Sequence, residues 1–561
     1  MEEKAGGCCA SAEGVATASE PQPGSGLLSH DCIPFSAVPH TTSLFRDYLF
    51  NHRRVAQFYP HEPTVAGVAA YARKLGFPAE RRARVADVLA RQNRAWGAGD
   101  AALAAIDQLR KGAVAVVSGQ QVGLLGGPFY SVLKAVAALQ LAGELTAQGI
   151  DAVPVFWLAT EDHDLAEVNH AFLPVEGQAL ERLTSTSRAA GEPPVGRVKF
   201  GAEIETLVAR AAELLPNDGV VAALRESYRA GETFGSAYAK LFARLFHEAG
   251  LILLDPLDAE LHAICGEVMA SAAERAPELD AALLARGKEL RDAGYHEQVK
   301  VTAESTLLFS LAGGERKVLH LAGEDFMVGA KRIPRAELLR RIREAPEEFS
   351  PNVLLRPLMQ DTLLPTVAYF GGPAEVAYFA QVEVVYRKLL GRVTPVLPRL
   401  SATVINSRMA KLMKRYGIGI SDMFHGAEQL REVLAQRVMP TELQHKFSAA
   451  GDEVAKMIAE LQSQLRVLDP TLVDAAERSG RKMQYQIAHL SGKAARAELR
   501  RNEYLDRDAA EILTLLFPEK GLQERTIPGI YMLAAHGQGL VEQLMEVAAT
   551  HCPGHHMVRV E

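Results

Sequence analysis

The sequence predicts an α/β protein in which a parallel-sheet core is joined to a mainly helical insertion and a C-terminal antiparallel coiled-coil hairpin. Two apolar, strand-like runs that enclose a helical one predict the sheet. Helical periodicity dominates residues 174–291 and predicts the insertion. Apolar residues at spacings of three and four beyond residue 441 predict the hairpin.

The core is expected to begin with one β-α-β unit. Residues 113–117 form a short apolar run rich in β-branched residues, as suits a strand buried on both faces of a sheet. A glycine-rich loop at 118–128, a helical pattern reaching Leu145 and a second strand-like run at 153–158 follow it. The crossover between two such strands is expected to be right-handed. Residues 64–109 predict two or three helices that cover one face of this sheet.

Composition and periodicity divide the chain into six segments. Residues 1–28 are rich in small and polar residues and predict a disordered tail. The core is expected at 29–173, followed by the helical insertion at 174–291 with one strand-like run at 251–255. It is expected to resume at 292–440, where strand-like runs occupy 299–310 and 318–326. The hairpin is expected at 441–515, and a final segment at 516–561 is expected to dock on the core.

Two apolar seams predict the hairpin, and Asp469-Pro470 between them suits a helix cap followed by a first-turn proline. The seams are Ile458, Leu461, Leu465, Leu468 and Leu472, and Met483, Ile487, Leu490, Ala494 and Ala497. One hairpin cannot bury all of these positions, so we expect it to mediate a homodimer. The Arg and Glu residues on its outer faces are interpreted as a solvated surface.

Composition excludes some classes of partner. The formal net charge of -7 offers no overall attraction to nucleic acid or to an anionic membrane, so neither is an expected partner. No apolar run reaches the roughly 18 residues that span a bilayer, and the N-terminus does not resemble a signal peptide. The five cysteines lack a paired zinc pattern and suggest reduced thiols, so a cytoplasmic location is expected; they are Cys8, Cys9, Cys32, Cys265 and Cys552.

The glycine-rich loop is the first candidate site, because ligands of open α/β sheets bind beyond the carboxyl ends of the strands. Its glycines, among them Gly126 and Gly127, would let the backbone approach a carboxylate or phosphate. Gln120, Gln121, Tyr130 and Lys134 would supply hydrogen-bond donors. A tight turn between strand and helix is the alternative interpretation.

The second candidate is the acidic loop that ends the second strand. Glu161, Asp162, His163 and Asp164 follow a buried run directly, and Asn169 comes soon after. Asp162, His163 or Asp164 could act as a catalytic base, while Glu161 and Asn169 would bind substrate. The alternatives are an acidic helix start and a metal site, but adjacent residues on a turn diverge, so no metal is expected here.

A third polar cluster interrupts an apolar stretch of the core, as the wall of a pocket would. For any single residue of this cluster, a structural role in a buried hydrogen-bond network is as good an interpretation as ligand binding. The candidates are Arg356, Gln360, Tyr369, Gly371, Gly372, Glu375, Tyr378 and Gln381. We expect this segment to complete a pocket between the other two loops.

The C-terminal tract from His551 to His556 superficially resembles a metal-binding sequence. It lacks a second ligand pair, so we interpret it as ordinary polar residues, with one histidine docking back on the core.

Several long motifs resemble the cysteine ligase family of bacillithiol biosynthesis, often called BshC. They are SGQQVGLLGGPFYSVLKA, VPVFWLATEDHDLAEVNH, GYHEQV at 294–299, LLRPLMQDTLLPTVAYFGGPAEVAYFAQ and LQER at 522–525. The resemblance extends from about Phe45 to the C-terminus. It adds Gln298, in the third motif, to the substrate-binding candidates.

The resemblance implies a Rossmann-like core, akin to class I aminoacyl-tRNA synthetases, and a coiled-coil domain used in dimerisation. The implied reaction adds cysteine to glucosaminyl-malate by amide formation, the last step of bacillithiol biosynthesis. Such chemistry normally activates the carboxylate as an acyl-adenylate. The chain has no HxGH at the first glycine-rich loop and no clear KMSKS loop, so the cofactor is left open between ATP and another nucleotide. The alternatives are a nucleotide- or metabolite-binding dimeric scaffold of a thiol-synthesis assembly, with little catalysis of its own, and a metal-dependent hydrolase.

Overall fold

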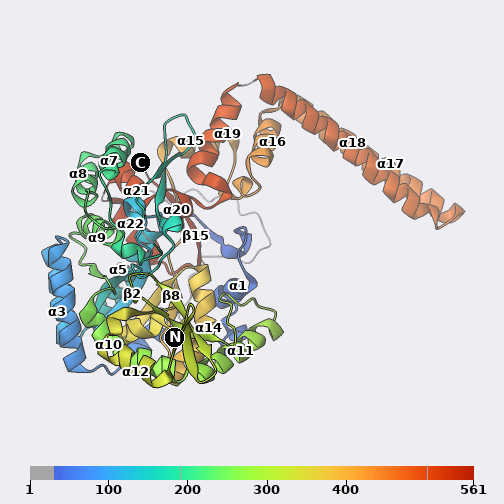
Figure 1. The fold of residues 1–561 in the computed structure, drawn as a ribbon. Coiled ribbons are helices and arrows are strands. Elements are labelled where there is room, and N and C mark those ends of the chain that lie inside the picture. Colours follow the sequence, from blue (N-terminus) through green and yellow to red (C-terminus); the bar gives the residue numbers. More distant parts are fainter. Residues whose placement is uncertain (1–30, 190, 502, 538, 561) are drawn as a thin grey trace. The chain divides into compact units, whose positions relative to one another are not determined.

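The computed structural model describes residues 31–189, 191–501, 503–537 and 539–560. The predicted tail at 1–28 lies outside the described residues. The chain forms two compact units (Figure 1). The first contains the described residues up to Leu173 together with Glu181–Thr403 and Glu524–Val558, and the second is formed mainly by Val404–Gln523.

A five-stranded parallel sheet lies at the centre of the first unit. Its order is β13-β12-β2-β3-β6, and every adjacent pair is parallel. The strands are β2 (Val114–Gln120), β3 (Ala152–Leu158), β6 (Ile252–Leu254), β12 (Thr366–Gly371) and β13 (Val396–Pro398). The α/β class and the parallel sheet predicted from the sequence are therefore confirmed.

The predicted β-α-β unit is present with small shifts at its ends. Ala115, Val116 and Val117 are fully buried, as expected for a strand covered on both faces. α5 (Tyr130–Ala147) connects β2 to β3 and packs on both strands. The three helices predicted upstream are α2 (Val65–Ala72), α3 (Ala79–Ala95) and α4 (Asp100–Lys111), of which α3 packs on β6 and α4 on β3.

The segment predicted as a helical insertion is largely helical but also contributes to the central sheet. Its helices are α7 (Glu203–Leu214), α8 (Asp218–Ser227), α9 (Phe234–Leu245), α10 (Ala259–Glu274) and α11 (Ala276–Asp292). β6, within the same segment, pairs with β3 as the edge strand of the central sheet. Its three residues are fully or almost fully buried, so the apolar run belongs to the core rather than to an insertion.

The runs at 299–310 and 318–326 were expected to resume the parallel core. They build a second, antiparallel sheet instead. Its order is β10-β9-β8-β7-β11. Short turns join β7 to β8, β8 to β9 and β9 to β10, and short turns permit only antiparallel pairing, whereas β11 follows α12 and pairs with β7. The strands are β7 (Ser305–Ser310), β8 (Lys317–Ala322), β9 (Asp325–Val328), β10 (Lys331–Ile333) and β11 (Phe349–Pro351).

Smaller elements lie wholly or partly in the first unit. A three-stranded sheet has the order β1-β15-β14, with β1 (Asp31–Pro34), β14 (Ala402–Ile405) and β15 (Gly554–Arg559). A hairpin is formed by β4 (His170–Leu173) and β5 (Glu181–Thr184). The remaining helices are α1 (Ser43–Phe50), α6 (Leu165–Val168), α12 (Arg335–Glu344), α13 (Arg356–Leu363), α14 (Pro373–Leu389), α20 (Gln523–Thr526), α21 (Gly529–His536) and α22 (Gly539–Ala548).

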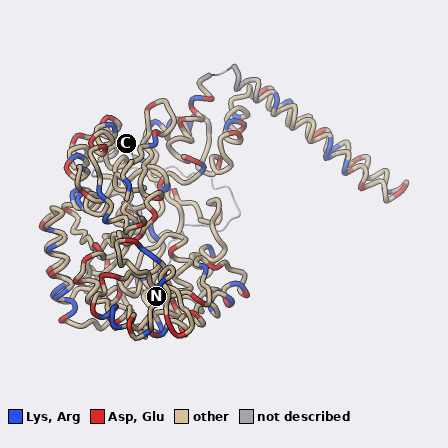
Figure 2. The backbone as a smooth tube through the Cα atoms, viewed as in Figure 1, with Lys and Arg blue, Asp and Glu red and all other residues tan. Residues whose placement is uncertain are grey.

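The second unit carries the predicted coiled-coil hairpin, α17 (Thr441–Leu468) and α18 (Leu472–Arg501). Asp469 lies at the tip and accepts a hydrogen bond from the backbone N–H of Thr471. Blue and red segments alternate along both helices in Figure 2, which suits a solvated face. Among the seam residues, Ile458 is buried against Gly480, whereas Leu461 and Leu468 are exposed, because each helix of a hairpin buries only one face.

The second unit begins earlier than the hairpin. α15 (Ser407–Tyr416), α16 (Ala427–Val438) and α19 (Glu503–Leu516) belong to it. Residues 404–440 were expected to belong to the core, but they lie in the second unit, where α16 packs on α18 and α19. No helix within the described residues is long and apolar enough to cross a membrane.

Candidate active site

A cavity of about 600 Å³ lies in the first unit at the carboxyl ends of β2, β3 and β12. The glycine-rich loop, the acidic loop and the segment from Arg356 to Tyr378 all contribute to its lining, so the structure brings together the three segments that the sequence analysis selected. Strands β2 and β3 pair in register from Val114↔Ala152 to Gln120↔Leu158, which puts the loops that follow them at one edge of the sheet. Parallel strand order is thus the cause of the convergence.

Charged side chains of both signs line this cavity. The cations are Lys134, Arg316, Arg356, Arg399 and Arg525, and the acids are Glu161, Asp162, Glu167 and Glu375. Aromatic and apolar side chains fill the space between them; they include Tyr130, Trp157, Val299, Phe309, Tyr369 and Tyr378. A site of this kind suits a ligand that itself carries both carboxylates and amines.

Gly126 and Gly127 of the first loop shape the turn and do not line the cavity, whereas Gly119 does. Gly126 and Gly127 have φ values of +83° and +69°, which favour glycine. The N–H of Gly126 donates to the hydroxyl of Tyr228, and that of Gly127 donates to the carbonyl of Leu124. Because protein oxygens already accept from both groups, the tight-turn interpretation holds for these two residues.

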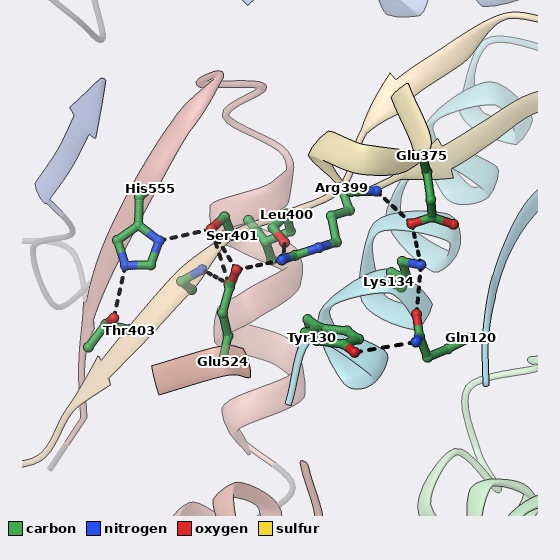
Figure 3. Close-up of polar contacts among 12 residues, drawn as sticks. Gln120, Tyr130, Lys134, Glu375, Arg399, Leu400, Ser401, Thr403, Glu524 and His555 are labelled. Carbon is green, nitrogen blue, oxygen red and sulfur yellow. Dashed lines mark hydrogen bonds and ion pairs between the residues drawn. The ribbon is translucent and has the colours of Figure 1, made fainter. Parts of the chain in front are cut away.

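Lys134 organises the polar residues of the same loop (Figure 3). Its ammonium is buried and donates to the carbonyl of Gly119 at 2.7 Å and to Oε1 of Gln120 at 2.9 Å. It also pairs with Oε2 of Glu375 at 2.5 Å. Nε2 of Gln120 donates in turn to the hydroxyl of Tyr130 at 3.3 Å. These contacts fix the orientation of the Gln120 amide at the cavity wall.

Burial and pairing have opposite effects on the Lys134–Glu375 pair. Burial lowers the pKa of Lys134, and the neighbouring Glu375 carboxylate only partly offsets this. For Glu375, burial would raise the pKa, but Lys134 and the backbone N–H of Gly372 together hold it below its usual value. The carboxylate also accepts from the hydroxyl of Tyr369. Glu375 is therefore a charged anchor between β12 and α5.

The acidic loop divides its side chains among different partners. Glu161 lines the cavity, and its Oε1 lies 3.3 Å from Nε2 of the buried His262. Asp162 lines the cavity, where Oδ2 accepts from Nε2 of Gln121 at 2.7 Å. Asp164 caps α6 by accepting from the N–H of Glu167 at 3.1 Å and is exposed. As expected for adjacent residues on a turn, the carboxylates diverge.

His163 does not line the cavity but contacts Arg316, which does. Its Nδ1 accepts from Nη1 of Arg316 at 3.0 Å, which assigns the ring proton to Nε2. Arg316 itself stacks over the ring of Phe309 with its guanidinium carbon 3.8 Å from the centroid, and donates to the carbonyl of Pro351. Of the three proposed bases, only Asp162 lines the cavity.

Arg356 is the central cation of the third segment. Its guanidinium carbon lies 4.9 Å from the ring centroid of Tyr369 and 5.6 Å from that of Trp157, and Nη1 donates to Oε1 of Gln360. Nη2 is buried and has no hydrogen-bond partner within the part of the chain that the structure describes. A buried cationic donor of this kind needs an acceptor, which a bound ligand can provide.

Several predicted site residues lie outside the cavity lining. Gln360 is a buried support for Arg356, and Gln381 is buried and exchanges hydrogen bonds with both backbone groups of Val299. Gln298 is exposed and accepts from His296. Gly371 is the last residue of β12, and Asn169 is the C-cap that follows α6.

Three arginines of the cavity were not selected from the sequence. Arg316 comes from the turn before β8, Arg399 follows β13, and Arg525 lies in α20. Of the three, only Arg525 lies in a motif that carries the family resemblance, LQER at 522–525. Single arginines in loops are indistinguishable among the 61 basic residues of the chain, and long-range packing alone selects these.

Arg399 connects the cavity to a buried polar network (Figure 3). Its Nη2 lies 2.6 Å from Oε1 of Glu524, and its guanidinium carbon is 5.2 Å from the ring centroid of Tyr130. Glu524 also accepts from the hydroxyl of Ser401, which lies 2.8 Å from Nδ1 of His555. Burial lowers the pKa of His555 to about 4, so the imidazole is neutral at physiological pH. The expected docking of a C-terminal histidine on the core is observed at this residue.

Comparison with known proteins gives concordant results over nearly the whole chain. Residues 28–400 match the family described as "Bacillithiol biosynthesis BshC, N-terminal Rossmann-like domain", and residues 402–560 match the corresponding "C-terminal coiled-coil domain". A protein of Koribacter versatilis is 50% identical over 94% of this chain and 99% of its own length. Proteins of Solibacter usitatus and Salinibacter ruber are 40% and 34% identical over 94% of this chain, and cover 99% and 98% of their own lengths. All three carry the name "Putative cysteine ligase BshC".

Proposed function

Because the chain belongs to the BshC family of bacillithiol biosynthesis, whose members are named cysteine ligases, we propose that it joins L-cysteine to glucosaminyl-malate in the cavity described above. The bond formed links the carboxyl carbon of cysteine to the amine nitrogen of the sugar. One carboxylate oxygen of cysteine leaves with the activating group.

The observation that carries this proposal is the mixed charge of the cavity. Glucosaminyl-malate brings two carboxylates and one amine, and cysteine brings one of each. Arg356, with its buried Nη2, suits a substrate carboxylate, because a guanidinium presents paired donors to a carboxylate. Arg316 and Arg525 add positive charge to the same cavity.

Asp162 is the proposed base. An amine attacks only when its nitrogen lone pair is free, so the ammonium of the sugar must lose a proton. Gln121 and the backbone N–H of His163 donate to the two carboxylate oxygens of Asp162 and fix their direction. Each oxygen retains capacity to accept a further proton from substrate. Gln121 also donates to Glu167, and this second acid of the cavity suits the amine of cysteine.

A carboxylate resists attack by an amine, so activation by a nucleotide is part of the proposal. The nearby donors that fit an anionic phosphate are the guanidinium groups of Arg316, Arg399 and Arg525, since they share one cavity with the buried Nη2 of Arg356. A bound nucleotide would supply the leaving group. The glycines Gly126 and Gly127 are not part of this proposed site, because their N–H groups already donate to protein oxygens.

We further propose that the enzyme is cytoplasmic and acts as a homodimer through α17 and α18. Large apolar side chains remain exposed on this hairpin, and a second copy would cover them. They are Leu443, Met457, Leu461, Val467, Leu468, Met483, Tyr485 and Leu490.

The deciding experiment incubates the purified chain with cysteine and glucosaminyl-malate, with ATP, with another nucleotide or with neither. Mass spectrometry of the mixture should detect the amide only in the presence of one nucleotide. Expression of the same gene in a strain that lacks its own ligase should restore the thiol. Restoration in cells without any turnover by the pure protein would instead favour the scaffold alternative.

A further inference from the structure

A cluster of two cysteines and one histidine lies where the first and last strands of the described chain pair. β1 and β15 are antiparallel, and Cys32 stands directly opposite His556 in their register. Cys552 precedes β15 and lies four residues before His556. The sulfur atoms of both cysteines and a ring nitrogen of His556 all lie within 4.8 Å of one another. The C-terminal tract lacked a second ligand pair in the sequence, and the fold adds one further ligand to it, Cys32.

The backbone is adapted to bring these side chains together. A Cβ atom on Gly554 would lie 2.3 Å from the sulfur of Cys32, so only glycine leaves room for the thiol at this position. Nε2 of His556 lies 3.1 Å from the carbonyl oxygen of Cys552. A hydrogen bond from Nε2 to a backbone carbonyl leaves the lone pair on Nδ1, and this arrangement is typical of histidines that bind a metal.

We propose that Cys32, Cys552 and His556 bind one Zn²⁺ ion. Thiolate and imidazole donors favour zinc over magnesium or calcium, which prefer oxygen. Zn–S and Zn–N bonds of about 2.3 and 2.0 Å separate tetrahedral ligands by roughly 3.5–3.8 Å, so side-chain shifts of about an ångström suffice. Binding replaces the protons of the two thiols, which are released to solvent.

Among the described residues the cluster provides three ligands, and water fills the fourth position. Cys552 and His556 also line a second cavity of about 660 Å³, from which that water can enter. The ion would link β1 to β15 and so connect the N-terminal strand to the C-terminal one. Its effect on stability is concentration-dependent, because it binds the folded state in preference to the unfolded one.

The test begins with tag-free, full-length protein purified under reducing conditions without chelator. Elemental analysis should give one zinc per chain. After the metal is removed, titration with Co²⁺ should produce a near-ultraviolet band from thiolate-to-cobalt charge transfer, which zinc then abolishes. Addition of zinc to the metal-free protein should raise the melting temperature.

Variants assign the ligands. Cys32→Ser, Cys552→Ser and His556→Asn should each lose the stoichiometric zinc and weaken the cobalt band. Two controls should keep both: Cys265→Ala, a buried cysteine whose thiol contacts the carbonyl of Met359, and the double variant Cys8→Ser/Cys9→Ser. Reduced wild-type protein that takes up neither zinc nor cobalt would overturn the proposal, even if Cys32 and Cys552 form a disulfide when the protein is oxidised. Loss of zinc in the double variant would overturn this choice of ligands.

Discussion

Arg399 and Glu524 form a buried ion pair, with Nη2 and Oε1 separated by 2.6 Å, between residues 125 positions apart in the chain. Arg399 faces the candidate active site, while Glu524 also accepts hydrogen bonds from Ser401 and from the N–H of Ala402. The pair therefore ties the wall of the cavity to the start of β14. Buried pairs of this kind are costly to break, because the remaining partner is left as an isolated charge.

Glu524→Gln should lower the free energy of unfolding by about 3–5 kcal/mol, because the guanidinium of Arg399 would lose its buried counter-charge. Denaturant titration followed by circular dichroism measures the loss. Glu344→Gln is the matched control: Glu344 pairs with Arg340 on an exposed helix face, and its replacement should cost less than about 1 kcal/mol. Equal losses in the two variants would contradict the role given to the buried pair.

Asp162→Asn should reduce the rate of amide formation by about 10²- to 10⁴-fold while the protein remains folded, because a positioned base contributes a factor of that size. Asp164→Asn is its neighbour control. Asp164 caps α6 outside the cavity, so this variant should keep nearly normal kcat and lose at most about 1 kcal/mol of stability. Steady-state kinetics of both proteins provide the comparison. If Asp164→Asn is inactive and Asp162→Asn is not, the assignment of the base is wrong.

Lys134 and Glu375 should be strongly coupled. Lys134→Met leaves the Glu375 carboxylate without its ammonium partner, and we expect a loss of about 3–5 kcal/mol in the free energy of unfolding. The double variant Lys134→Met/Glu375→Gln should lose less free energy of unfolding than the sum of the losses in the two single variants. A double-mutant cycle in denaturant measures the coupling, and strictly additive losses would show that the pair is not a unit.

Asp280 predicts a pH dependence of stability. Burial raises the pKa of this α11 carboxyl to about 7, and its Oδ2 has no hydrogen-bond partner among the described residues. The folded state therefore holds a proton that the unfolded state releases near pH 4. The associated stability is fully present below pH 4 and is lost as the pH rises through about 7, by up to about 1.4 kcal/mol per pH unit.

Asp280→Asn should remove this contribution and make the variant more stable than the wild type above pH 7. The measurement is the free energy of unfolding of both proteins from pH 5 to pH 8. Asp292→Asn, an exposed change at the end of the same helix, should retain the slope of the wild type. If the free energy of unfolding of Asp280→Asn changes with pH as steeply as that of the wild type, this carboxyl is not the source of the pH dependence.

The hairpin of α17 and α18 is expected to associate with a second copy. Leu461→Glu adds a charge to its exposed apolar face and should shift micromolar protein from dimer to monomer in sedimentation velocity. Ser463→Glu adds the same charge at an exposed polar position two residues away and should leave the dimer intact. A monomeric wild-type protein would contradict the prediction.

The sequence by itself determined the local elements of this protein. β-branched runs such as Val114 to Val117 gave β2, and the spacing around Ile458 gave α17, because periodicity and side-chain shape act within one element. Strand order in a β-α-β unit is also a local constraint. For this reason the convergence of the loops that carry Gln121 and Asp162 could be predicted before any coordinates.

Only the tertiary structure decided which side chains of those loops face the cavity and which distant residues join them. Asp162 faces the cavity, whereas Asp164, two positions later, caps a helix. A loop has no regular periodicity from which these two directions could be predicted. Arg316 and Arg399 reach the cavity from an antiparallel sheet and from the end of β13. Cys32 meets His556 across a strand pair that joins the two ends of the chain. Such contacts depend on the packing of the whole unit, and no local pattern encodes them.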